Sequence, residues 1–217
     1  MSSARRGWRH VSDPLAVLQR IRETRPRSVE QAEERCELCA EPVPDDHGHL
    51  VDLAVRNLLC ACRGCYLLFL SDGAGGGHYR SVPDRYLTLG EFRLTSSQWD
   101  RLQIPVGIAF FFFNSTLGRM AAFYPGPAGA TESELPLDTW AEVVAVNPTL
   151  DALEPDVEAF LVRTGTNHGG AECYLVPIDA CYELVGHLRR LWRGFDGGRE
   201  AHEKLDSFFD TIRSKAR

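Results

Sequence analysis

Alternation of apolar and polar residues marks a pair of strands in the first third of the chain. Every second residue between 49 and 55 is apolar (Val51, Leu53 and Val55), as in a strand that buries one face. A second apolar segment follows at 58–61 after a short polar interval. The two segments together predict a β-hairpin.

The second half of the chain carries longer apolar patterns of two kinds. Continuous or alternating apolar segments predict strands at 108–113, 120–124, 157–163 and 173–177. Apolar residues spaced three and four positions apart predict helices at 136–146, at 179–192 with Asp179 as the N-cap, and at 199–213. Glycine, proline and alanine dominate 125–134, and a polar glycine-rich segment occupies 164–170, so both are expected to be loops.

Composition divides the chain into four segments. We expect a basic N-terminal helical segment at 1–35, a metal-binding module at 36–70, a glycine-rich linker region at 71–100 and an α+β domain at 101–217. The predicted fold class is α+β, with the metal module joined to a small mixed sheet and C-terminal helices. The 217 residues and 44% hydrophobic content are sufficient for a substantial core.

Five cysteines within 30 residues carry the clearest chemical signal. They form the motifs Cys36-Glu-Leu-Cys39 and Cys60-Ala-Cys62-Arg-Gly-Cys65. Two C-x-x-C pairs that flank a hairpin are typical of a metal site, because each pair points two thiolates at one ion. A tetrahedral site takes four ligands, so we predict one ion per chain, held by Cys36, Cys39, Cys62 and Cys65, with Cys60 as the alternate.

The order of elements around these cysteines bears on the metal. A treble-clef finger has a cysteine pair, a hairpin, a second cysteine pair and then a helix. This chain is predicted to have the same order, with a helix that contains Leu67, Leu68 and Leu70, which favours Zn²⁺. A rubredoxin-like iron site uses the same four thiolates and is the alternative. Four protein ligands leave no open coordination position, so such a site indicates a structural or electron-transfer role and not catalysis.

Other candidate residues have weaker signals. His47 and His49 could replace a cysteine ligand, but a polar turn explains them better. Cys181, at a helix start, could be reactive, although both it and Cys173 fit buried structural positions better. His168, in the loop at 164–170, could act as a base, yet its surroundings match no known phosphate-binding or dinucleotide motif. The sequence identifies no catalytic residues.

Charge and apolar content limit the remaining function classes. A net charge of −6 and a pI near 5.7 argue against extensive nucleic-acid binding, despite an arginine-rich N-terminus. No segment has the apolar length of a membrane span or of a secretory signal, which predicts a cytoplasmic protein. Paired thiols in such a reducing compartment are expected to bind metal more often than to form disulfides.

Several motifs from about residue 30 to the C-terminus resemble an uncharacterised bacterial family. They are Cys36-Glu-Leu-Cys39, Cys60-Ala-Cys62-Arg-Gly-Cys65, Ile104-Pro-Val-Gly-Ile-Ala-Phe110, Tyr124-Pro-Gly-Pro-Ala-Gly-Ala-Thr-Glu-Ser133, Leu153-Glu-Pro-Asp-Val-Glu158, Tyr182-Glu-Leu-Val-Gly186 and Trp192-Arg-Gly194. Genes of that family tend to lie among those of high-affinity, actinobacterial-type [NiFe]-hydrogenases. The resemblance therefore implies a hydrogenase accessory or maturation role, with a hydrogenase subunit or one of its maturation proteins as the partner.

Three functions are consistent with the sequence. The first is a non-enzymatic metal-binding accessory protein that supports assembly, maturation or electron supply of a [NiFe]-hydrogenase. The second is a small-molecule-binding or enzymatic domain that uses the segments 125–133 and 164–170, which a pocket reached by both would favour. The third is a nucleic-acid-binding zinc finger, which a basic face around the finger would favour.

Overall fold

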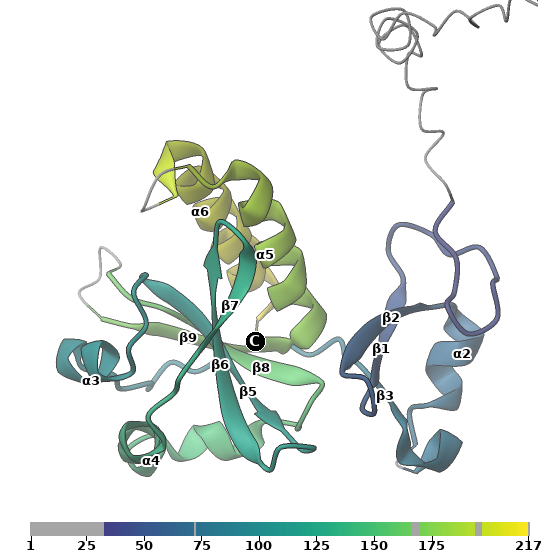
Figure 1. Cartoon of the computed structure of the whole chain (residues 1–217), viewed down its shortest axis with the longest axis horizontal. Coiled ribbons are helices and arrows are strands. Elements are labelled where there is room, and N and C mark those ends of the chain that lie inside the picture. The colour runs from purple at the N-terminus through teal and green to yellow at the C-terminus, as the bar shows by residue number, and fades with distance from the viewer. Residues whose placement is uncertain (1–32, 72, 166–169, 194–196, 217) are drawn as a thin grey trace, which may run out of the picture. The chain divides into compact units, whose positions relative to one another are not determined.

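Two antiparallel sheets organise the protein, and a computed structural model describes residues 33–71, 73–165, 170–193 and 197–216 (Figure 1). The helices predicted before residue 33 lie outside the described residues. Residues 35–217 form one unit, separate from the N-terminal segment. Among the described residues, no helix is both long and apolar enough to cross a lipid bilayer.

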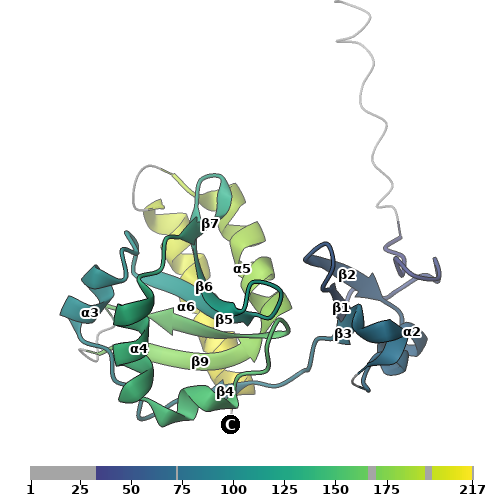
Figure 2. The same ribbon diagram turned by 60° about the horizontal axis from the view of Figure 1, so that its bottom comes forward.

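The first sheet contains the predicted hairpin and one further strand. Its strands are β1 (Gly48–Asp52), β2 (Asn57–Ala61) and β3 (Tyr79–Ser81), in the order β2-β1-β3. The short helix α2 (Arg63–Leu68) follows β2 and lies beside this sheet, and the 3-10 helix η1 (Ala74–Gly77) leads into β3 (Figure 2). Cysteine pair, hairpin and helix therefore occur in the expected order.

Strand β1 ends earlier than its apolar pattern predicts. The Asp52 Oδ1 atom accepts hydrogen bonds from the backbone N–H groups of Ala54 and Val55, at 2.9 and 3.2 Å. An aspartate that bonds the backbone two and three residues ahead stabilises a turn in place of a strand. Leu53 and Val55 consequently belong to the turn, and Val55 is 68% exposed.

The second sheet has six strands in the order β4-β9-β8-β5-β6-β7, and every pairing is antiparallel. Its strands are β4 (Leu87–Thr88), β5 (Ile108–Asn114), β6 (Arg119–Gly126), β7 (Gly129–Ser133), β8 (Glu158–Arg163) and β9 (Glu172–Pro177). The expectation of a small mixed sheet is thus replaced by a larger, antiparallel one. The predicted α+β class with C-terminal helices is confirmed.

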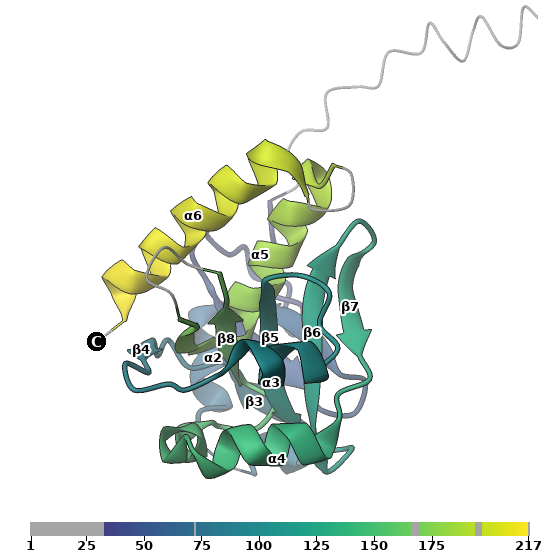
Figure 3. The ribbon, with the colours of Figure 1, turned by 90° about the vertical axis from the view of Figure 1, so that its left-hand side faces the viewer.

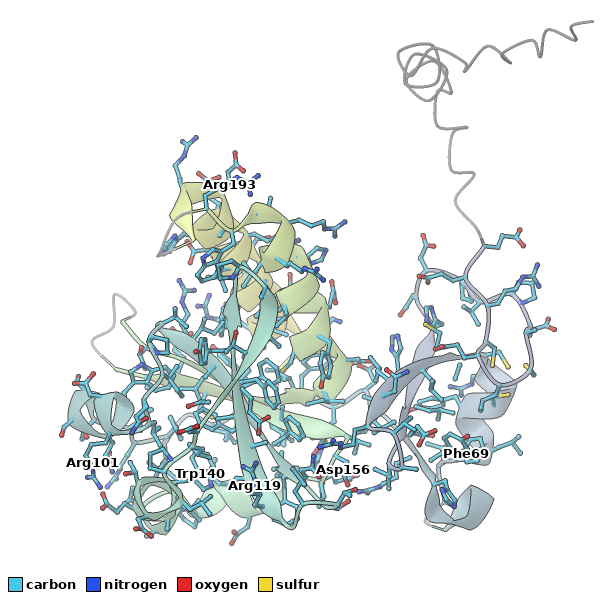
Figure 4. All side chains as sticks on the ribbon, in the orientation of Figure 1. Phe69, Arg101, Arg119, Trp140, Asp156 and Arg193 are labelled. Atoms are coloured by element: carbon cyan, nitrogen blue, oxygen red, sulfur yellow. The ribbon has the colours of Figure 1, made fainter. Side chains whose placement is uncertain are left out.

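Helices cover both faces of the six-stranded sheet (Figure 3). One face packs against α5 (Ile178–Leu191) and α6 (Gly198–Lys215), through a cluster that includes Phe110, Leu184 and Phe209. The other face packs against α3 (Ser96–Arg101), α4 (Leu137–Ala145) and the 3-10 helix η2 (Pro148–Ala152). Phe111 on this face stacks on Trp140 of α4, with ring centroids 4.7 Å apart; Trp140 is labelled in Figure 4.

The prediction of a loop at 125–134 is wrong, because most of this segment is strand. Strand β6 continues through Pro125, which pairs with Ala130 of β7, and Gly126 pairs with Gly129 across a tight turn. Gly129 has a φ of 116°, which an L side chain rarely adopts. Proline is tolerated in a strand where one side of its backbone is unpaired, and Pro125 lies beyond 119–123, the part of β6 that pairs with β5. The composition therefore indicated a loop where the edge of the sheet permits a hairpin.

Two arginines, one in β3 and one after it, bond to β8 and to the segment before it. Arg80 donates to the Pro155 carbonyl at 2.7 Å. Arg85 forms a two-pronged pair with Glu158, which is fully buried, and also donates to the Ala152 carbonyl. Apolar residues of the hairpin, Val51 and Leu58, pack against the same core cluster as α5.

Candidate metal centre

The first cysteine pair lies in a tight turn before β1. The Cys36 carbonyl accepts from the Ala40 N–H at 2.8 Å, and the Cys36 N–H donates to the Glu41 carbonyl at 2.8 Å. Ala40 closes the turn with a φ of 62°, and Arg35 donates to its carbonyl at 3.0 Å. This turn places the side chains of Cys36 and Cys39 together.

The second pair lies at the start of helix α2. Cys62 is the N-cap residue, and its Sγ accepts from the Cys65 N–H at 3.5 Å. Its carbonyl accepts from the Tyr66 N–H at 2.9 Å, which begins the helix. The start of α2 therefore holds the Cys62 sulfur against the backbone of Cys65, the other member of the pair.

Two hydrogen bonds join the first turn to strand β2. The Glu37 N–H donates to the Cys60 carbonyl at 2.9 Å, and the Glu37 carboxylate accepts from the Cys60 N–H at 2.7 Å. The first cysteine pair is therefore fixed next to the point where β2 leads into the second pair. In Figure 4 the yellow sulfur atoms of this region gather beside the hairpin and α2.

The four predicted ligands form one cluster. The Sγ atoms of Cys36, Cys39, Cys62 and Cys65 all lie within 4.8 Å of one another, and those of Cys39 and Cys62 are 3.6 Å apart. Four sulfurs arranged tetrahedrally about 2.3 Å from one Zn²⁺ would be separated by about 3.8 Å. The donor set and its spacing therefore fit a four-coordinate soft metal ion, and the cluster could hold one.

Proton affinities within the cluster are unequal. Burial raises the pKa of Cys36, but hydrogen bonds from the backbone N–H groups of Cys62, Cys39 and Leu38 outweigh it and lower that pKa to about 6. Burial, followed by the neighbouring thiols, raises the pKa of Cys65 to about 12. Four adjacent thiols cannot all ionise without a compensating cation, and a bound metal ion supplies that charge.

The other two cysteines are core residues. Cys173 on β9 and Cys181 on α5 are 2% and 0% exposed. Burial raises the pKa of both thiols, and for Cys181 the nearby Asp179 carboxylate adds to the effect. Both side chains are therefore packed as neutral thiols, the structural interpretation that the sequence favoured.

A second group of ligand-type side chains lies beside the four-cysteine cluster. His47, His49 and Cys60 each offer one ligand atom, and these atoms lie within 4.8 Å of one another. The local sequence around the two histidines favours a polar turn. The sequence places a histidine on each side of Gly48 and a cysteine in the next predicted strand, which was the only indication of this group. The strand register is needed to show that the three side chains meet.

One hollow among the described residues lies away from the loops proposed for small-molecule binding. A hollow of about 50 Å³ is lined by Val51, Leu53, Arg56, Asn57, Leu58, Phe112, Asn114, Thr116, Asp156, Ile178 and Tyr182. None of these residues belongs to 125–133 or 164–170. His168 lies outside the described residues.

The segment that contains both cysteine pairs has no excess of positive charge. Residues 36–70 contain Arg56 and Arg63 against five acidic residues: Glu37, Glu41, Asp45, Asp46 and Asp52. A nucleic-acid-binding surface usually clusters lysine and arginine on one face. The composition of this module therefore does not support the nucleic-acid-binding alternative.

Comparison with known proteins places the chain in a family without assigning an activity. No curated protein and no solved structure matches the chain. A family model matches residues 35–216, which includes both cysteine pairs, both sheets and the C-terminal helices. The chain thus belongs to a family of unknown function, DUF5947.

Proposed function

We propose that the protein is a non-enzymatic metal-binding accessory protein whose four-cysteine site holds one structural Zn²⁺. The observation that carries this proposal is the cluster of four thiol sulfurs within 4.8 Å. Four protein ligands complete a tetrahedral shell, which leaves no position for substrate or water. The ion would then fix the two cysteine turns and the hairpin between them.

Zn²⁺ is proposed in preference to iron because of the elements that surround the site. The second cysteine pair begins helix α2, and the first pair precedes the β1–β2 hairpin, the order of a treble-clef finger. In protein purified without added metal, elemental analysis should give one zinc for the four-cysteine site of each chain. A red oxidised sample with one iron per chain would instead support electron transfer, because an iron–thiolate site absorbs visible light and Zn²⁺ does not.

The proposed context is the assembly, maturation or electron supply of a [NiFe]-hydrogenase in the cytoplasm. The motifs that resemble hydrogenase-associated proteins support this, together with a closed metal site that suits a structural or electron-transfer role. The proposed partner is a hydrogenase subunit or one of its maturation proteins. The N-terminal 30 residues and the metal module are the proposed contact regions.

Exposed leucines of the module support this choice of contact surface. Leu67 and Leu68 of α2, and Leu70 just after it, are 46%, 67% and 56% exposed. Helix α2 has no buried residue, so these leucines contribute little to the core. Clustered exposed apolar side chains are typical of protein–protein interaction surfaces.

Deletion and co-purification test the partner proposal. Deleting the gene in a host that makes the hydrogenase should lower H₂ oxidation without changing transcription of the enzyme. The double substitution Leu67→Asp and Leu68→Asp should abolish co-purification with hydrogenase proteins while one ion per four-cysteine site is retained. Unchanged H₂ uptake in the deletion strain would overturn the hydrogenase proposal.

A matched variant controls for loss of an exposed leucine elsewhere. Leu117 lies in the turn between β5 and β6 and is 45% exposed. Leu117→Asp should leave both co-purification and metal content unchanged. Turnover of a small substrate by the purified protein would contradict the non-enzymatic role itself.

A further inference from the structure

We propose that His47, His49 and Cys60 form a second metal site, which binds a divalent transition-metal ion such as Zn²⁺ with one coordination position open. The proposal goes beyond the structural role of the four-cysteine site and does not depend on the hydrogenase partner. Its ligand atoms lie within 4.8 Å of one another. Its donor set, two imidazoles and one thiolate, suits Zn²⁺, Co²⁺ and Cu²⁺.

Strand register brings the three side chains together. His49 on β1 pairs directly with Cys60 on β2. Residues paired across an antiparallel ladder point their side chains to the same face, with Cβ atoms about 5 Å apart. His47 precedes β1 by one residue, and its ring centroid lies 4.8 Å from that of His49, with the rings tilted by 48°.

Hydrogen bonds fix the tautomer of both histidines. His49 Nδ1 lies 2.8 Å from Asp179 Oδ2, and His47 Nδ1 lies 2.7 Å from the Pro44 carbonyl oxygen. A carbonyl or carboxylate oxygen only accepts, so each Nδ1 carries the proton. In a neutral imidazole the lone pair is then on Nε2, which is the nitrogen that can bind a metal ion.

Asp179 gives the site the support typical of metal-binding histidines. A metal-bound histidine usually donates its other ring N–H to a carboxylate or a backbone carbonyl, which orients the ring and strengthens it as a ligand. Asp179 supplies the carboxylate from the first turn of α5, and Pro44 supplies the carbonyl. Asp179 was expected to cap α5, but Pro177 is the N-cap residue and the Asp179 carboxylate bonds His49 and its neighbour Ala180.

The site differs from the four-cysteine site in its coordination. Three protein ligands leave one tetrahedral position for water or another small donor, as in zinc sites that react or exchange ligands. His47, His49 and Cys60 are all half-buried, and the side chains of His49 and Asp179 are 24% and 25% exposed. Because one coordination position is not filled by the protein, this ion should exchange faster than the one held by four thiolates.

Metal titration of the full chain tests the second site. Untagged protein, reduced and saturated with Zn²⁺, should carry two ions by native mass spectrometry and elemental analysis. His49→Ala and Cys60→Ser should each carry one ion and retain the four-cysteine site. One ion at saturation in the unsubstituted chain, or loss of the first ion in His49→Ala, would overturn the proposal.

A substitution outside the ligand set provides a second test that does not depend on the stability of the ligand variants. Asp179→Asn should weaken binding at the second site by about 10–100-fold, because the asparagine cannot polarise the imidazole as a carboxylate does. His202→Ala removes an exposed histidine of α6 and should still bind two ions. Equal affinity of the second ion in Asp179→Asn and the unsubstituted chain would contradict the assignment.

The open position has its own spectroscopic signature. With Co²⁺ as the probe, added imidazole should shift the visible bands of the second ion and leave those of the four-cysteine site unchanged. Bands that do not respond to imidazole at either site would show that no position is open. These readouts are independent of any hydrogenase, so failure here and failure of the proposed partner can be told apart.

Discussion

The two sheets of this protein are stabilised by different means. Between residues 35 and 82 the buried apolar side chains of the described chain are Cys36, Leu50, Ala61 and Val82. The six-stranded sheet instead carries a hydrophobic cluster on each face, packed against α5 and α6 on one side and α3 and α4 on the other. A segment with so few buried residues does not gain enough from apolar burial to offset the entropy of ordering its chain.

This difference indicates what the four-cysteine site contributes. When a metal site is absent from the unfolded chain, the free energy of metal binding is also free energy of folding. The three-stranded sheet should therefore depend on its ion, and the six-stranded sheet should not. The following substitutions test that division, beginning with the largest expected effect.

Loss of a thiolate ligand should separate the two regions most clearly. Cys65→Ser should release the ion from the four-cysteine site, removing an apparent binding free energy of about 10–16 kcal/mol, typical of structural zinc. Hydrogen exchange should then lose protection in β1 and β2, while β5, β8 and α5 remain protected. Strand β1 that stays protected after metal loss would show that the module folds without its ion.

Truncation of a core aromatic side chain should destabilise the six-stranded sheet and leave the metal site intact. Phe111 is 0% exposed and stacks on Trp140, so Phe111→Ala should lower the free energy of unfolding by about 3–5 kcal/mol. Denaturant unfolding followed by tryptophan fluorescence measures this change. Metal content should stay the same, and a loss of metal in this variant would show that the regions are not independent.

The buried ion pair beside the connecting segment should have an intermediate effect. Glu158 is fully buried, and Arg85→Met would leave its charge without its main partner, at a cost of about 3 kcal/mol. Arg101 and Glu142 form a comparable pair at the surface, where both side chains are about half exposed. Arg101→Met should have a much smaller effect in the same denaturation experiment, because solvent screens a surface ion pair. Equal costs for the two variants would contradict the role assigned to burial.

A small change inside the metal module should have the smallest effect of this series. A Cβ atom on Gly48 would lie 2.5 Å from Cδ2 of Tyr66, whose hydroxyl donates to the Val82 carbonyl. Gly48→Ala should therefore displace the ring and destabilise the metal-loaded module by about 1–3 kcal/mol. Gly90→Ala is the matched control, because no atom lies within 4 Å of its added Cβ. Local hydrogen exchange in β1 should respond to the first substitution only.

Much of the secondary structure follows from local sequence rules. Apolar alternation predicted the β1–β2 hairpin, and the apolar segments at 108–113 and 120–124 predicted the strands β5 and β6, which pair with each other. Both C-terminal helices lie where the three- and four-residue spacing placed them. These predictions succeed because period and turn chemistry act over a few neighbouring residues. The hairpin at 125–133 was missed because its glycine and proline content indicates a loop, and the sheet edge that tolerates them is not visible locally.

The sequence by itself determined that the chain has two cysteine pairs suited to one metal ion, because their spacing is a local property. The sequence could not show which ligands surround Cys60, because it lies two residues from Cys62 and could belong to the four-cysteine cluster or to the group with His47 and His49. Strand pairing decided this by placing Cys60 opposite His49. The contact between His49 and Asp179 spans 130 positions in the chain and exists only because the hairpin packs beside the start of α5. The sequence determines which ligand types are present, whereas strand register and packing between distant segments determine how the ligands are grouped.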